Sequence, residues 1–190
     1  MKTIIRSFRF SALAMLFAVA SLATMAQVQY KLDSKNSSIL VKGTSTIHDW
    51  EMNVKASTSS FTLQEDQSLE RLTSGSFTVG VASIESDKNI MNKKAWEALK
   101  EEKFPQIKAK LLQVSQNGNS GTVQMELTIA GKTQKVADDF KLTNGSGKIL
   151  VEGILDLKMT DFGVEPPTAM MGTIKTGNEI KVEYKLVYNK

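Results

Sequence analysis

The chain has 190 residues, of which 24 are lysine or arginine, 20 are aspartate or glutamate and none is cysteine. The lack of cysteine excludes disulfides, thiolate metal sites and a lipid anchored through an N-terminal cysteine. Three of the basic residues lie within the first 26, so the remainder carries 21 basic against 20 acidic residues. This near-neutral balance gives no electrostatic basis for binding nucleic acid.

The first 26 residues have the features of a secretory signal peptide. A basic start precedes an apolar run over residues 10–23, which is shorter than the roughly 20 residues that a membrane-spanning helix needs. We therefore expect cleavage after Ala26 and a periplasmic or secreted location. The mature chain would be a single domain over residues 27–190 without a transmembrane segment. The basic residues at the start of the expected signal peptide are Lys2, Arg6 and Arg9.

From residue 27 onward, apolar and polar residues alternate in one segment after another, as in amphipathic β-strands. Clusters of glycine, asparagine, aspartate and serine separate the segments and indicate turns. The pattern predicts an all-β antiparallel fold of about eight strands, either a barrel or a sandwich. The expected strands are residues 28–32, 38–44, 48–57, 59–64, 72–84, 106–115, 121–130 with a continuation to 142, 148–160 and 179–188.

Residues 90–102 interrupt the alternation with strong helix formers. Ser86 or Asp87 is expected to cap the helix start, and Pro105 follows its end. A helix of about three turns between strands would cover one opening of the sheet. Its apolar stripe consists of Met91, Ala95 and Leu99.

The expected inward positions carry large, adaptable side chains, among them Phe61, Phe77, Phe162 and several methionines. Such side chains suit a barrel interior that accepts a flexible apolar guest. A plain packed core explains them equally well, so composition leaves both alternatives open.

Several short motifs occur in a fixed order along the mature chain. They are YKLD (30–33), TSTIHDW (44–50), GSFTV (75–79), ASIES (82–86), KFPQI (103–107), LTIAGKT (127–133), MTDFGV (159–164) and PPTA (166–169). Together they resemble the YceI-like family of lipocalin-like, polyisoprenoid-binding periplasmic proteins, between about Tyr30 and Tyr188. Many members carry an Arg-Asp pair at the helix start, where this chain has the residues Ile90, Met91 and Asn92. The difference bears on how a ligand head group is held.

The resemblance implies an eight-stranded antiparallel, lipocalin-like β-barrel with one helix inserted between strands. It also implies an exported protein that holds a long-chain polyisoprenoid, such as an isoprenoid quinone or a similar apolar lipid, for storage or transport. No enzymatic activity, cofactor or metal is expected. The alternative is a non-catalytic structural or interaction barrel with a filled core. A homodimer remains open in either case.

Fifteen residues are the candidates for lining an apolar cavity, because alternation places most of them on the inward face. A register error of one would reverse the strand assignments together. The candidates are Trp50, Phe77, Val79, Val81, Met91, Trp96, Ile107, Leu127, Ile129, Leu155, Leu157, Phe162, Met171, Val182 and Tyr184.

His48 is the only histidine, and it is followed by Asp49. If both lie on a strand, their side chains point to opposite faces and cannot form a catalytic dyad. We expect His48 to be a hydrogen-bonded residue at the rim of the barrel. One histidine without cysteine also lacks the usual transition-metal ligand sets.

Two acidic pairs, Asp138-Asp139 and Glu101-Glu102, are expected to lie on the solvated surface. Lys93-Lys94 could instead receive a phosphate or an anionic lipid head, although a solvated helix face is favoured. Trp96 is either a gate for the lipid or the anchor of the helix. The loop with Pro166-Pro167 and Met170-Met171 is either an entry portal or a cover over the core.

Overall fold

The computed structural model describes residues 27–64, 68–145 and 147–190. The expected signal peptide, residues 1–26, lies outside the described residues. The described part is built almost wholly of β-strands, with one α-helix, α1 (Asn89–Ala98), and four short 3-10 helices. The strands are β1 (Gln27–Leu32), β2 (Ser38–Ser45), β3 (Trp50–Val54), β4 (Ser57–Gln64), β5 (Leu72–Gly80), β6 (Ile84–Glu85), β7 (Gln106–Asn117), β8 (Ser120–Ile129), β9 (Lys132–Gly145), β10 (Lys148–Lys158), β11 (Thr168–Ala169) and β12 (Ile174–Asn189). The 3-10 helices are η1 (Leu69–Arg71), η2 (Val81–Ser83), η3 (Met159–Phe162) and η4 (Met170–Gly172).

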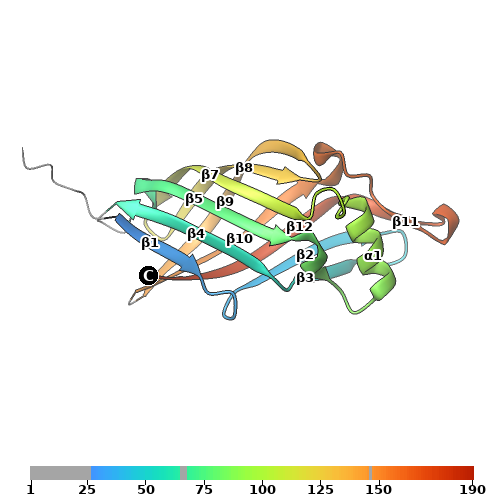
Figure 1. Ribbon diagram of the computed structural model, residues 1–190, viewed down its shortest axis with the longest axis horizontal. Helices are drawn as coiled ribbons and strands as arrows, with labels where there is room; N and C mark the ends of the chain where they lie inside the picture. The colour runs from blue at the N-terminus through green and yellow to red at the C-terminus, as the bar shows by residue number, and fades with distance from the viewer. Residues whose placement is uncertain (1–26, 65–67, 146) are drawn as a thin grey trace, which may run out of the picture.

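The strands close into an antiparallel barrel of eight walls (Figure 1). Three walls consist of two short strands in succession: β1 with β2, β3 with β4, and β5 with β6. The walls β7, β8, β9 and β10 follow in chain order. The last wall, β12, pairs with β10 on one side and with β2 and β1 on the other. The expected eight-stranded antiparallel barrel with one inserted helix is confirmed.

The breaks between strands arise where polar side chains bond to the backbone. Ser45 Oγ donates to the His48 carbonyl, so the strand expected over 48–57 begins only at Trp50. Ser83 Oγ donates to the Gly80 carbonyl and turns the chain into η2, which interrupts the strand expected over 72–84.

Residues 121–142, expected as one strand with a continuation, form two antiparallel strands instead. Ala130 and Gly131 both have positive φ, 48° and 81°, and they connect β8 to β9 in a two-residue hairpin turn. Glycine supplies this conformation at no steric cost, and the Phe104 ring occupies the space where its side chain would lie.

The helix also begins differently from the prediction. Lys88 is the N-cap and makes no side-chain cap bond, so neither Ser86 nor Asp87 caps α1. Ser86 is instead bound by the buried Asn92: Asn92 Oδ1 accepts from the Ser86 N–H at 2.7 Å and from its Oγ at 2.8 Å, and Asn92 Nδ2 donates to the Ser86 carbonyl. This cluster fixes the approach to the helix.

The two ends of the barrel differ. We call the end where β1 begins the closed end, because buried side chains fill it, and the end with α1 and β11 the helix end (Figure 1). At the closed end, Tyr30 stacks on Phe61 with ring centroids 5.1 Å apart, and Tyr188 meets Phe61 edge-on at 4.8 Å. The best buried of the residues that fill this end are Tyr30, Leu63, Leu142 and Ile149, each at most 2% exposed.

Candidate binding cavity

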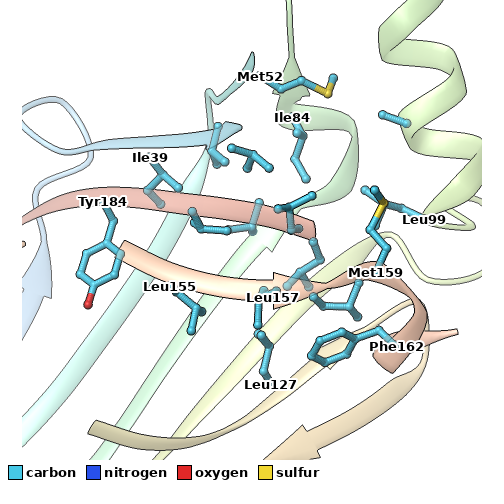
Figure 2. A pocket seen from close by; sticks show the side chains of 18 of the residues that line it. Ile39, Met52, Ile84, Leu99, Leu127, Leu155, Leu157, Met159, Phe162 and Tyr184 are labelled. Atoms are coloured by element: carbon cyan, nitrogen blue, oxygen red, sulfur yellow. The ribbon is translucent and has the colours of Figure 1, made fainter. Parts of the chain in front are cut away.

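The barrel encloses a cavity of about 840 Å³. Side chains from every wall of the barrel and from α1 line it, and most of them are apolar. Figure 2 shows Leu99 at the C-cap of α1, Leu157 of β10 and Phe162 of η3 pointing into this common space, with Tyr184 farther from the helix. The interior is therefore hollow, which contradicts the alternative of a filled core.

The cavity exists because the inward side chains do not meet across the barrel. Inward residues such as Phe77, Met125 and Val182 remain only partly buried, since one side of each faces empty space. An interior that side chains fill would be packed at the density of an organic crystal. The volume falls within the 300–1,000 Å³ that is typical of ligand pockets.

Alternation predicted the inward face without a register error. Twelve of the fifteen candidate residues line the cavity, although whether they contact a ligand stays a prediction. The twelve are Trp50, Phe77, Val79, Met91, Ile107, Leu127, Ile129, Leu155, Leu157, Phe162, Val182 and Tyr184.

Val81, Trp96 and Met171 are not among the lining residues. Val81 lies in η2, where the period-2 rule does not hold; it is 1% exposed and its N–H donates to the Pro105 carbonyl. Trp96 Nε1 donates to the Ile84 carbonyl at 2.9 Å and ties α1 to β6, which makes Trp96 an anchor. Met171, with a φ of 55°, lies fully exposed in η4.

Asp138 corrects the sequence prediction most clearly. It was expected on the solvated surface with Asp139, but it is 7% exposed and lines the cavity, whereas Asp139 is exposed and accepts a bond from Thr122. Tyr184 Oη donates to Asp138 Oδ2 at 2.5 Å. Burial raises the pKa of the Asp138 carboxyl above its ordinary value, against the opposing effect of the Tyr184 bond.

The signal for this residue was present in the sequence. Val136, Phe140 and Leu142 share the parity of Asp138 in β9, so period 2 places all four on the inward face. Burial also raises the pKa of the Tyr184 hydroxyl, and the bond to Asp138 raises it further. Because of the raised pKa, the Tyr184 hydroxyl is protonated at neutral pH. Both Asp138 and Tyr184 face the cavity.

A second polar contact lies toward the closed end. Tyr188 Oη lies 2.9 Å from Ser59 Oγ, and both residues line the cavity. Burial raises the pKa of Tyr188 to about 12, so this hydroxyl is also neutral in ordinary conditions.

His48 lies in the loop between β2 and β3, so the argument from opposite strand faces does not apply to it. The residue is exposed, and it lines the cavity at the helix end. Its ring Nδ1 lies 2.7 Å from the Asp49 carbonyl oxygen rather than from the carboxylate. Across the described ranges, no group of three histidine, cysteine or acidic residues is placed to hold a metal ion.

The entrance at the helix end combines lysines with exposed apolar residues. Lys88, Lys94 and Lys158 line the cavity, and Lys94 Nζ donates to the Thr168 carbonyl. Lys93 is exposed and is not among the lining residues, as expected for a solvated helix face. Of the acidic pair in the same region, Glu102 is exposed and Glu101 partly so. The exposed large apolar residues at this end are Ile47, Ile90, Met170 and Met171.

The loop before β12 has one part that lines the cavity and another that points away from it. Pro167 lines the cavity together with β11, which agrees with a rim at the entrance. Met170 and Met171 point away from the core, at 73% and 108% exposure. In the part of the chain that the structure describes, no helix has the length and apolar character needed to span a membrane.

A closed antiparallel barrel with an apolar internal cavity and one helix beside its entrance defines a lipocalin-like class of binding fold. Within that class, the chain belongs to the YceI-like family: it matches the YceI-like domain over residues 30–188. Among curated proteins, no relative matches the chain.

Solved structures share this fold at low sequence identity. Burkholderia cenocepacia BcnA has 18% identity and a TM-score of 0.70, and the match covers 82% of this chain and 98% of that one. A polyisoprenoid binding domain from Saccharophagus degradans, implicated in plant cell wall breakdown, has 12% identity and a TM-score of 0.62 over 84% of this chain and 97% of that one. The Campylobacter jejuni YCEI protein has 16% identity and a TM-score of 0.62 over 73% and 84%.

Proposed function

We propose that this protein binds a long-chain apolar lipid, a polyisoprenoid such as an isoprenoid quinone, inside the barrel and stores or transports it without chemical turnover. The observation that carries the proposal is the apolar cavity of about 840 Å³. The Saccharophagus degradans domain of the same fold, which is described as polyisoprenoid-binding, supports it.

The size of the cavity fits this class of guest. At the roughly 30 Å³ that one water occupies in the liquid, the cavity holds about 28 non-hydrogen atoms, or between five and six isoprene units. Burial of such a chain is favourable by about 25 cal/mol per Å² of apolar surface removed from water. Apolar contacts discriminate weakly between chains of similar girth, so cavity length and shape would set the preference.

We also propose that the protein is exported. The described residues that follow the expected cleavage site, from Gln27 onward, supply all eight walls of the barrel. The chain would reach the periplasm or the exterior, where an apolar lipid needs a carrier to cross water.

The test is to express the full chain in a bacterial host, purify the exported product and extract it with organic solvent for mass spectrometry. We expect a near-stoichiometric polyisoprenoid or another long-chain lipid. Absence of lipid, together with no uptake of added geranylgeraniol, would overturn the proposal.

A matched pair of variants links the lipid to the cavity. Leu155→Trp places a large ring inside the barrel, whereas Ile154→Trp places it on the outer face, where Ile154 is 54% exposed. We expect the first variant to lose most of the extracted lipid and the second to retain it. Equal retention by two folded variants would show that the lipid is bound elsewhere.

A further inference from the structure

A buried carboxylate lies halfway along the largely apolar interior of the barrel. Asp138 is six residues from the start of β9 at the helix end and seven from its end at the closed end. Its partner, Tyr184, comes from β12, and β10 lies between the two strands. The pair therefore bridges three walls in the middle of the cavity wall.

Gly153 of β10 makes this bridge sterically feasible. It is the register partner of Tyr184, and the tyrosine ring lies over it; a side chain on Gly153 would overlap the Tyr184 hydroxyl. The fold therefore positions the three residues together as one polar site, and Asp138 is not an isolated charge.

The site has unused capacity to accept hydrogen bonds. A carboxylate has about four acceptor positions; on Asp138, Tyr184 occupies one of them and the backbone N–H of Asp139 a second. Having donated its proton to Asp138, the Tyr184 hydroxyl can act toward a guest only as an acceptor. Both groups can therefore accept a hydrogen bond from a guest that carries a donor.

Among the residues that the structure describes, no other charge neutralises the site from inside the barrel. Asp139 and Asp156 are on the outer face, where Thr122 and Lys181 bind them. Lys158, the lining lysine on β10, is five residues from Gly153, roughly 16 Å along the strand. An anionic group at Asp138 would meet uncompensated repulsion, because a buried charge needs a partner.

We propose that Asp138 and Tyr184 bind the polar end of the lipid, that this end is an uncharged hydrogen-bond donor such as a hydroxyl or a primary amide, and that the apolar chain runs from there toward the helix end. This inference rests on the proposed function and adds the chemical class and the orientation of the guest: among isoprenoids it favours an alcohol or a quinol over an oxidised quinone, whose carbonyls only accept hydrogen bonds. It predicts discrimination against an ether, an ester or a phosphate at the same chain end.

The test compares three probes of one chain length: geranylgeraniol, its methyl ether and geranylgeranyl phosphate. Binding is followed by the change in tryptophan fluorescence as a guest displaces water from Trp50, which lines the cavity, and by co-elution of the probe with the protein. A hydrogen bond to a charged group contributes about 1.5–3 kcal/mol, so we expect the alcohol to bind at least about 10-fold more tightly than the ether. The phosphate should bind more weakly than the alcohol.

Asp138→Leu should reduce the alcohol-to-ether ratio to within about 2-fold while the ether still binds. Asp139→Leu, the same change at the neighbouring outward residue, should keep the wild-type ratio. If Asp138→Leu does not fold, Asp138→Asn keeps the shape and removes the charge, and its ratio should fall to less than about a third of the wild-type value, since bonds to neutral groups are weaker.

The outcomes separate the two proposals. If none of the three probes changes the fluorescence of wild-type protein or co-elutes with it, lipid binding itself is overturned. Equal binding of alcohol and ether, unchanged in the Asp138 variants, would overturn only the polar anchor. Tighter binding of the phosphate would also overturn it, because the head group would then lie at the lysines of the helix end.

Discussion

At the closed end, aromatic rings pack against one another and the fill is nearly complete; at the helix end, the same alternating strands surround empty space. Tyr30 is 1% exposed in the first region, whereas Ile90 is 75% exposed in the second. Binary alternation places apolar residues inward in both. What distinguishes the regions is side-chain size and cross-barrel contact, so stability and binding capacity are concentrated in different parts of one sheet.

The largest expected contrast comes from removing one leucine side chain from each region. Leu142→Ala at the closed end should lower the free energy of unfolding by about 2–5 kcal/mol, because the leucine is 2% exposed and its loss leaves a void. Leu99→Ala at the C-cap of α1 should cost only about 1–2 kcal/mol, since part of that side chain already faces the cavity. Urea unfolding measures both, and equal costs would contradict the division.

Loss of the Asn92 side chain should have the next largest effect, and it should be local to the helix end. Asn92→Ala leaves the Ser86 N–H without its partner, at a cost of about 1–3 kcal/mol. Hydrogen exchange should accelerate in α1 and remain unchanged in β9. Asn89→Ala, an exposed position in the same helix, should stay within about 0.5 kcal/mol of wild type and serves as the control.

The pH dependence of stability should have opposite signs at two aspartates. The folded-state pKa of Asp138 lies above its ordinary value of 3.8, so wild-type protein loses stability as the pH rises from 3.8 through the raised pKa. Asp138→Asn should lack this loss and gain stability relative to wild type at pH 7.

Asp33 supplies the comparison. Hydrogen bonds from Asn36 and Asn189 lower the pKa of its carboxyl, so its contribution to stability is present above 3.8 and is lost as the pH falls through the lowered pKa. Asp33→Asn should therefore be less stable than wild type at pH 7 and converge with it in acid. Thermal unfolding between pH 2.5 and 7 checks both variants, and parallel curves for the two would contradict the assignment.

The smallest effect is expected at the exposed rim of the helix end. Met171→Ser should change the free energy of unfolding by no more than about 0.5 kcal/mol, because the side chain is fully exposed. A larger loss in urea unfolding would mean that the rim packs against the barrel.

Period 2 was sufficient for an antiparallel all-β fold and for most of the cavity lining, because it fixes the face of each residue wherever a strand is regular. The choice of a barrel over a sandwich came from the resemblance to the YceI-like family. Period 2 failed where the strands break: Val81 in η2 and Met171 in η4 have no strand face to share. Asp138 was missed for another reason, since its acidic neighbour suggested a solvated pair although its own parity was inward. Hollow and filled interiors have the same alternation, so only the three-dimensional packing of the side chains distinguishes them.

The filled closed end has a consequence for guests of different length. Since Tyr30 and Leu63 block one exit, a chain that outgrows the barrel must leave its surplus outside, beyond α1. Affinity should then rise with each added isoprene unit until the interior is full and reach a plateau, because the surplus stays in water. The protruding segment would remain accessible to a second protein, so a recipient protein could bind the guest before the carrier has released it.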